Sequence, residues 1–214
     1  MMRRGKPVDN VDVKVVLLGK AFAGKTCLVQ RYINQSYNDT PYSNTIGAAF
    51  ASKKLSCKGR NVVLNIWDTA GSERYQSMSK IYYRGARAAI LCYDLTDKSS
   101  FEKIRFWVSE LQTNEENCRM YLCGTKKDLI DDDPESRAVS LSVVESLAQD
   151  LQSDIYETSS ITGETVDEMF EKLAEDYVLN MKSNPSTKEN GVDESVLTLH
   201  EHSPSTHRWK CFQC

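Results

Sequence analysis

Apolar and polar positions divide the chain into short apolar runs that alternate with amphipathic segments over residues 11–182. This alternation is typical of an α/β domain built around a mostly parallel sheet. The run at 14–18 is almost continuously apolar, which favours a strand buried on both faces. We expect strands at 14–18, 48–57, 62–67, 88–93, 120–123 and 154–158.

Turn and capping residues order these runs into a topology. The short connection at 58–60 (Lys-Gly-Arg) predicts an antiparallel hairpin between the second and third strands. Three S/T-x-x-E patterns predict helix starts at Ser99, Ser142 and Thr165. The last helix, 166–182, carries an apolar stripe that predicts packing against the core and consists of Met169, Phe170, Leu173 and Tyr177.

The chain divides into three parts. Residues 1–10 form a short N-terminal extension, 11–182 form the domain, and 183–214 form a tail rich in Ser, Thr, Asn, Pro and Glu. The tail lacks periodic apolar positions, so we expect it to be disordered. Its three Lys and Arg residues stand against four Asp and Glu residues, so it is no polybasic membrane arm.

Composition limits the classes of function. The 214 residues are enough for one domain, and an apolar content of 40% allows a packed core. A net charge of −3 provides no basic field, so nucleic-acid binding is not expected. No apolar run suits a membrane-spanning helix or a signal peptide, which predicts a cytosolic protein with reduced cysteines.

The most specific local pattern is Gly19-Lys20-Ala21-Phe22-Ala23-Gly24-Lys25-Thr26, which matches the phosphate-loop pattern GxxxxGK[ST]. It lies between a predicted strand and an amphipathic helix, where backbone N–H groups and the positive helix end would cradle phosphates. Lys25 would bring a point charge to the terminal phosphates, and the hydroxyl of Thr26 would bind Mg²⁺. An ordinary strand–helix turn is the alternative interpretation.

A second phosphate-side motif follows the third apolar run. Asp68 stands at the carboxyl end of that run, where an aspartate can bind Mg²⁺, and Gly71 lets a backbone N–H approach a γ-phosphate. Thr45, between the two motifs, would give the metal a second hydroxyl. A helix cap at Asp68 and a turn at Thr45 are the alternatives, which the order and spacing of the motifs disfavour.

Together with these motifs, four further stretches resemble the small GTPases of the Ras superfamily and, among them, the Rab family. They are IGAAF at 46–50, WDTAGSERY at 67–75, YYRGA at 82–86 and LCYDLT at 91–96, and the resemblance covers 11–182. It implies the phosphate-loop small GTPase fold, an α/β fold whose six-stranded, mostly parallel sheet has one antiparallel strand and five flanking helices. It also implies GTP or GDP and Mg²⁺ as ligands.

The resemblance implies a role for single residues. Thr45 and Gly71 would sense the γ-phosphate in two switch loops, Asp128 would accept the two guanine N–H donors, and Lys126 would lie over the base. The implied metal ligands are Thr26, Thr45 and Asp68. The implied nucleotide contacts are Gly19, Ala21, Phe22, Ala23, Gly24, Lys25, Thr26, Cys27, Tyr37, Tyr42, Thr45, Gly71, Thr125, Lys126, Asp128, Ser159, Ser160 and Ile161.

Three residues depart from the family pattern. Ser72 stands where most small GTPases carry the glutamine that orients the attacking water, so a catalytic set of Ser72, Thr45 and Gly71 predicts slow hydrolysis. Thr125 replaces an asparagine that ties the base motif to the phosphate loop, and Ile161 replaces a lysine beside the guanine. Each lost hydrogen bond would cost about 1 kcal/mol of nucleotide affinity.

The sequence ends in Cys211-Phe212-Gln213-Cys214, which fits both a CxxC and a C-a-a-X prenylation pattern. The resemblance implies geranylgeranyl groups on Cys211 and Cys214, added with a Rab escort protein and a prenyltransferase. Two lipids would anchor the chain firmly to a membrane, and one would anchor it weakly. A zinc site formed with the tail histidines His200, His202 and His207 is an alternative that the spacing disfavours.

The favoured function is a Rab-type molecular switch of membrane traffic, in the cytosol and on the cytoplasmic face of endomembranes. Its implied partners are effectors at the switch loops, an exchange factor, a GTPase-activating protein and a GDP-dissociation inhibitor. Ser72 with Thr125 resembles the atypical Rab-twenty-four-like branch, which is associated with autophagy and late endosomes. The alternatives are a membrane scaffold locked in one nucleotide state and an ATP-using phosphotransferase, which Lys126 and Asp128 disfavour.

Overall fold

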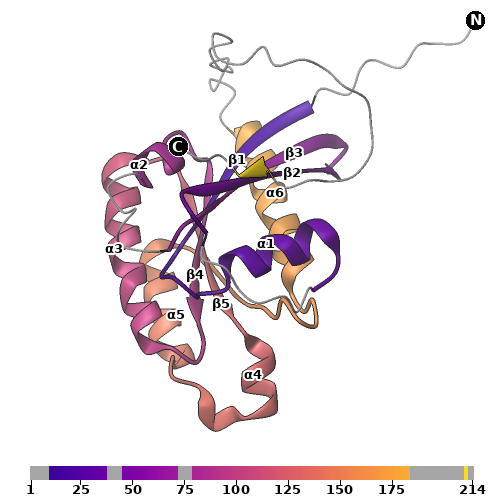
Figure 1. Ribbon diagram of the computed structural model, residues 1–214. Coiled ribbons are helices and arrows are strands. Elements are labelled where there is room, and N and C mark those ends of the chain that lie inside the picture. Colours follow the sequence, from indigo (N-terminus) through magenta and orange to yellow (C-terminus); the bar gives the residue numbers. More distant parts are fainter. Residues whose placement is uncertain (1–9, 38–44, 72–78, 184–209, 212–214) are drawn as a thin grey trace, which may run out of the picture.

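The computed structural model describes residues 10–37, 45–71, 79–183 and 210–211, and these form one sheet covered by helices on both faces (Figure 1). The strand order in the sheet is β6-β5-β4-β1-β3-β2-β7. The parallel strands are β1 (Asn10–Leu18), β3 (Arg60–Thr69), β4 (Ala88–Asp94), β5 (Arg119–Thr125) and β6 (Asp154–Glu157).

The hairpin predicted from the short connection is confirmed. β2 (Ala48–Cys57) pairs antiparallel with β3 through a tight turn at Lys58 and Gly59, both of which have positive φ. A further strand, β7 (Lys210–Cys211), pairs antiparallel with Ala49 and Phe50 of β2. The expected sheet of six strands therefore gains a seventh of two residues, from a tail whose composition predicted disorder.

Six α-helices lie in the described residues, one more than the five expected. They are α1 (Lys25–Asn34), α2 (Ser79–Tyr83), α3 (Lys98–Asn114), α4 (Lys127–Asp132), α5 (Leu141–Leu151) and α6 (Val166–Ser183). A 3₁₀ helix covers Pro134–Ser136. Because α2 and α4 span two turns or fewer, hydrophobic periodicity alone does not reveal them.

Two of the three predicted helix starts are wrong by two residues. The cap of α3 is Asp97, whose carboxylate accepts a hydrogen bond from the backbone N–H of Ser99 at 2.9 Å. The residue that precedes α5 is Ser140 instead of Ser142. At α3 the difference arises because Asp97, two positions earlier, caps the helix, whereas Ser140 takes the cap position of α5 without a side-chain hydrogen bond. The third helix, α6, begins directly after Thr165, as expected.

The central strand β1 contributes to a separate core on each face of the sheet, as its apolar run predicts. Val13, Val15 and Leu17 point toward the core formed with α1 and α6, whereas Val16 and Leu18 point toward the core formed with α2, α3 and α5. Figure 1 shows α3 and α5 on one side of the sheet and α1 and α6 on the other. The stripe of α6 is confirmed as core, since Met169, Phe170 and Leu173 are at most 1% exposed.

This burial fixes the sheet, so the loops at its carboxyl edge begin from rigid positions. β1, β3, β4, β5 and β6 all end at that edge because they are parallel. Within the described part of the chain, no helix has the length and apolar character to cross a bilayer.

A buried carboxylate joins α6 to the opposite edge of the sheet. Asp176 is 5% exposed and accepts a hydrogen bond from the hydroxyl of Tyr121 at 3.0 Å. It also forms ion pairs with Arg119 at 3.1 Å and with Lys172 at 2.5 Å. Arg119 has a second partner in Asp154 at 2.9 Å, so the charges form a small network.

We expect Asp176→Ala to lower the free energy of unfolding by about 3 kcal/mol, because it removes the acceptor of a buried hydroxyl and a buried ion pair. Urea unfolding of the GDP-bound protein measures the loss. Lys58→Ala is the control, since Lys58 of the hairpin turn forms an exposed ion pair at 3.0 Å with Glu175, the α6 residue next to Asp176. Its unfolding midpoint should stay unchanged. Equal losses in the two variants would contradict the prediction.

Candidate functional site

The turn between β1 and α1 requires glycine at both of its ends. Gly19 has φ +153°, and a Cβ there would lie 2.2 Å from the carbonyl oxygen of Cys92. Gly24 has φ +71°, in the left-handed region, and a Cβ there would lie 3.1 Å from the hydroxyl of Thr125. The glycine-framed turn read from the sequence is thus present, directly before the start of a ten-residue helix.

Lys25 sits inside this turn. Its side chain is buried, and Nζ donates hydrogen bonds to the carbonyl oxygens of Gly19 at 3.0 Å and Lys20 at 2.9 Å. Burial lowers the pKa of Lys25, although Asp68 and Cys92 oppose that effect. The ammonium group is therefore held at the centre of the loop, where a phosphate would neutralise it.

The remaining loop residues differ in exposure. Ala23 is buried, whereas Phe22 is 59% exposed and adopts a left-handed φ of 67°. Cys27 is half-buried in the first turn of α1, and burial raises its pKa. A left-handed backbone is unfavourable for a bulky residue, so the turn imposes strain at Phe22.

Thr26, Thr45 and Asp68 meet at one point of the carboxyl edge. The two threonine hydroxyls lie 2.9 Å apart. Asp68 is fully buried, and neither of its carboxylate oxygens accepts a hydrogen bond from a described residue. Burial raises the pKa of Asp68 to about 6, while nearby Thr26 and Lys25 lower it more weakly. Although Thr26 influences that pKa, its hydroxyl and the carboxylate are outside hydrogen-bond geometry.

Two hydroxyls beside a buried, unsatisfied carboxylate suit a hard cation that prefers oxygen ligands, such as Mg²⁺. The three residues predicted as metal ligands therefore fit that ion. Across the described residues no group of three His, Cys, Asp or Glu side chains gathers to hold a metal, so a metal here would depend on the threonine hydroxyls. When bound, Mg²⁺ would neutralise phosphate charge between Thr26 and Thr45.

The segments that hold Thr45 and Asp68 also contact each other. The backbone N–H of Ala70 donates to the carbonyl oxygen of Gly47 at 2.8 Å. A Cβ on Gly71 would lie 2.4 Å from the backbone nitrogen of Ala21, so only glycine fits there. The second predicted switch segment thus meets the phosphate loop through the backbone at Gly71, and the first meets it through the hydroxyl pair of Thr45 and Thr26. A γ-phosphate at this point would lie beside both segments.

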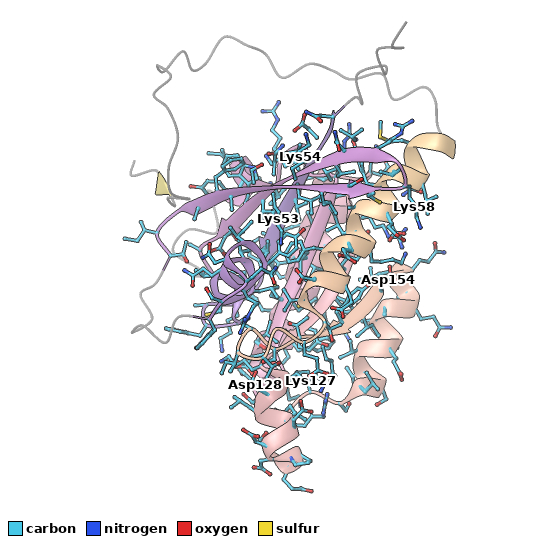
Figure 2. All side chains as sticks on the ribbon, turned by 90° about the vertical axis from the view of Figure 1, so that its right-hand side faces the viewer. Lys53, Lys54, Lys58, Lys127, Asp128 and Asp154 are labelled. Carbon is cyan, nitrogen blue, oxygen red and sulfur yellow. The ribbon has the colours of Figure 1, made fainter. Side chains whose placement is uncertain are left out.

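The predicted base-binding residues gather at the start of α4, where Figure 2 labels Lys127 and Asp128 far from Lys58 of the hairpin. The hydroxyl of Ser159 donates to Oδ1 of Asp128 at 2.5 Å. Ser159 is fully buried, so this bond orients the Asp128 carboxylate. The backbone N–H of Lys127 donates to the carbonyl oxygen of Thr158 at 3.0 Å and ties the two loops together.

Thr125 joins the base side to the phosphate side with one hydroxyl group. Its Oγ1 lies 3.2 Å from the carbonyl oxygen of Ala23 and 3.1 Å from that of Tyr93. One hydroxyl proton serves these two acceptors, so the connection exists but is weaker than two separate bonds. The side chain of Ile161 is 51% exposed and offers no polar group to a base.

Several predicted site residues lie at the margin of the described residues or outside them. Tyr37 ends the segment after α1 and is 37% exposed. Tyr42, Ser72 and Cys214 lie outside the described residues, as do the tail histidines of the alternative zinc site. Cys211 lies in β7, so only one of the two predicted lipidation cysteines is among the described residues.

Three side chains around the site were not predicted from the sequence. Asp94 forms an ion pair with Nζ of Lys126 at 2.5 Å. Its position at the carboxyl end of a buried strand was the same signal that identified Asp68. Asp97 pairs with Lys20 at 2.9 Å, and hydrogen bonds from Ser99 and Lys20 lower its pKa to about 2. Arg31 contacts the Ser159–Ile161 loop, which no local pattern predicts.

Comparison with known proteins agrees with this geometry. The family model described as "Ras family" matches residues 14–179. The chain is 46% identical over 192 residues to the Ras-related protein Rab-24 of Dictyostelium discoideum, which covers 88% of this chain and 94% of the relative. It is 39% identical over 183 residues to Rab-21 of Bos taurus (85% and 80%) and 38% identical over 199 residues to the Ras-like GTP-binding protein RYL2 of Yarrowia lipolytica (90% and 95%).

A phosphate loop on this sheet, with two segments that meet it, defines a nucleotide-binding switch of the phosphate-loop class. The chain belongs to the Ras family of small GTPases and, within that superfamily, is a Rab protein similar to Rab-24. Rab proteins are GTP-binding switches of membrane traffic that work with effectors, exchange factors, GTPase-activating proteins and a dissociation inhibitor. The predicted small GTPase fold is confirmed.

The raised pKa of Asp68 predicts a conflict between binding and stability. Because burial moves this pKa from 3.8 to about 6, the nucleotide-free protein loses stability as the pH rises across that range. Asp68→Asn removes this penalty, so we expect the nucleotide-free protein to gain about 2 kcal/mol at pH 7. Chemical unfolding with a chelator present, from pH 4 to pH 8, measures the gain, and Mg²⁺-dependent GTP binding should be lost in parallel.

Asp97→Asn is the matched control, and its expected change in stability at pH 7 has the opposite sign. A carboxylate with a lowered pKa stabilises the folded state above its unfolded pKa, so this variant should be less stable than the parent at pH 7. A loss of stability at pH 7 in Asp68→Asn as well would contradict the assignment of a buried, unsatisfied carboxylate.

Proposed function

We propose that this chain is a Rab switch that hydrolyses GTP slowly and therefore stays GTP-bound for long periods. The proposal of GTP and Mg²⁺ binding is supported above all by one arrangement of side chains. The hydroxyls of Thr26 and Thr45 lie 2.9 Å apart, beside Asp68, whose buried carboxylate has no hydrogen-bond partner among the described residues. These three residues come from the phosphate loop and the two switch segments, so a bound nucleotide would hold all three together.

Slow hydrolysis follows from the residue after Gly71. Ser72 carries a short hydroxyl where the attacking water needs an amide to orient it, and intrinsic small-GTPase rates with that amide are already only on the order of 10⁻⁴ s⁻¹. A GTPase-activating protein would also have to act without the amide that orients the water. The runner-up function, a membrane scaffold without useful turnover, rests on the same serine.

Effectors are proposed to bind over the switch segments and the sheet edge between them. Ile46 and Ile81 are 66% and 70% exposed, and Phe50 packs edge-on against Trp67 with ring centroids 5.4 Å apart. Trp67 in turn contacts the ring of Tyr82. Exposed apolar side chains beside a nucleotide-dependent switch are suited to a protein partner.

We further propose a lipid anchor on Cys211 and Cys214, attached with a Rab escort protein and a prenyltransferase, and a location on autophagosomal or late endosomal membranes. The terminal cysteine pattern supports the anchor. The 46% identity to a Rab-24 and the presence of both Ser72 and Thr125 support the branch to which that location belongs.

Ser72→Gln tests the slow switch. Restoring the amide should raise single-turnover GTP hydrolysis by about tenfold or more, and protein isolated from cells should then carry mostly GDP instead of GTP. Chromatography of the bound nucleotide measures both the hydrolysis rate and the proportion of GTP and GDP bound in cells. Ser72→Ala is the control and should stay as slow as the parent. A parent rate equal to that of the Gln variant would refute the slow switch, and bound ATP would refute the guanine assignment.

Cysteine substitution tests the anchor. Mass spectrometry of the protein from cells should find geranylgeranyl groups on both terminal cysteines. Cys211→Ser or Cys214→Ser should leave one lipid and a partly cytosolic pool, and the double variant should be fully cytosolic, because stable anchoring requires two signals. Membrane sedimentation with and without a prenyltransferase inhibitor measures this. Free thiols alone on the parent chain would refute the anchor.

A further inference from the structure

Arg31 connects the phosphate-loop helix to the base loop. It lies in the last turn of α1, and its Nε donates a hydrogen bond to the carbonyl oxygen of Ser160 at 2.5 Å. Its Nη2 donates to the carbonyl oxygen of Ile161, the next residue. One planar guanidinium group therefore binds two successive main-chain oxygens through two nitrogens held in a fixed fork. The single nitrogen of a lysine ammonium does not reproduce that fixed geometry.

The space around the guanidinium is shaped for this contact. Gly163 follows the bound segment, and a Cβ there would lie 3.7 Å from Cδ of Arg31, so the loop passes close to the arginine stem. A second connection lies beside it, where Nε2 of Gln35 donates to Asp167 at 3.0 Å. The C-terminal end of α1 is thus joined to the base loop and to the start of α6.

The loop that Arg31 holds positions the residue expected to recognise the base. The hydroxyl of Ser159 donates to Oδ1 of Asp128 at 2.5 Å and accepts a hydrogen bond from the backbone N–H of Thr162 at 3.1 Å. A shift of this loop would therefore move the Ser159 hydroxyl and release the Asp128 carboxylate. The orientation of Asp128 depends on the main chain at 159–162, and that main chain is bound by Arg31.

We propose that Arg31 is a positioning residue for guanine recognition, which holds the Ser159–Ile161 loop so that Ser159 aligns the Asp128 carboxylate with the base. Because α1 begins at Lys25 and ends near Arg31, one rigid helix would then link the phosphate contacts to the base contacts. The proposal rests on the proposed binding of guanine nucleotide. It adds a residue that does not itself touch the nucleotide.

A positioning role and a purely structural role for Arg31 predict different effects on nucleotide binding. The two roles can be distinguished by comparing nucleotides that carry different bases. Guanine presents N1–H and a 2-amino group to a carboxylate, whereas hypoxanthine presents N1–H alone. If Arg31 aligns Asp128, its loss should weaken the two-bond contact more than the one-bond contact. If it only supports the fold, GDP and inosine diphosphate should be weakened by the same factor.

The test measures dissociation of fluorescent GDP and of fluorescent inosine diphosphate from the full chain with Mg²⁺ present. We expect Arg31→Met to accelerate GDP dissociation by about tenfold and to reduce the preference for GDP over inosine diphosphate by about fivefold. Arg31→Lys, which keeps the charge but has one donor nitrogen in place of the two fixed nitrogens of the guanidinium fork, should lie between Met and the parent.

Arg119→Met is the matched control. It removes an arginine with two ion pairs from the network with Asp154 and Asp176, at the amino end of β5. It should lower the unfolding temperature and leave both dissociation rates and their ratio unchanged. If Arg31→Met does not fold, the ratio of the two dissociation rates measured with Arg31→Lys tests the proposal alone.

Parental GDP dissociation from Arg31→Met, or equal weakening of the two nucleotides, would overturn the proposal. A parent chain that binds neither nucleotide would instead overturn the proposed function, so the two failures are distinguishable.

Discussion

Lys25 and Asp68 carry opposite charges that the fold removes from water at one edge of the sheet. Burial lowers the pKa of Lys25 and raises that of Asp68, so each group is held where its charged form is disfavoured. Neither can move into solvent, because the strands and helix that bear them are packed into the two cores. An anionic phosphate and a divalent cation are the partners that would satisfy both groups together. The site is in this sense less stable without its ligand than with it.

Close backbone contacts are the second constraint on the site. At Gly19 and Gly71 a single Cβ atom would overlap with the main chain of Cys92 and of Lys20–Ala21. The phosphate loop therefore touches strand β4 on one side and the second switch segment on the other, with no side chain between them. Contacts of this kind cannot yield gradually, since packed backbone atoms either fit or separate. A change in phosphate occupancy next to Gly71 would accordingly displace the switch segment as a unit.

Most of the fold could be predicted from the sequence, because it follows from apolar runs that have one stable arrangement. β2 has the expected bounds, and the other predicted strands differ only at their ends. The misses have two causes. The cap of α3 was a local choice between two polar residues, and Asp97 makes it in place of Ser99. Other contacts are tertiary, since the hydroxyl of Thr125 meets two carbonyls that lie 102 and 32 residues away in sequence. Arg31 was missed because its partners are main-chain oxygens, which leave no pattern in side chains.

The main-chain partners of Arg31 explain how the chain tolerates one of its departures from the family pattern. A contact to a carbonyl oxygen does not depend on the side chain of the residue that carries it, so an isoleucine at 161 is compatible with the bond from Arg31. The base loop can then keep its position while the polar cover that a lysine would give is absent. Thr125 is different, since its own hydroxyl is the connection and is shared between Ala23 and Tyr93. Of the two departures, Thr125 would therefore weaken the link between the base loop and the phosphate loop, and Ile161 would remove only a polar group beside a base.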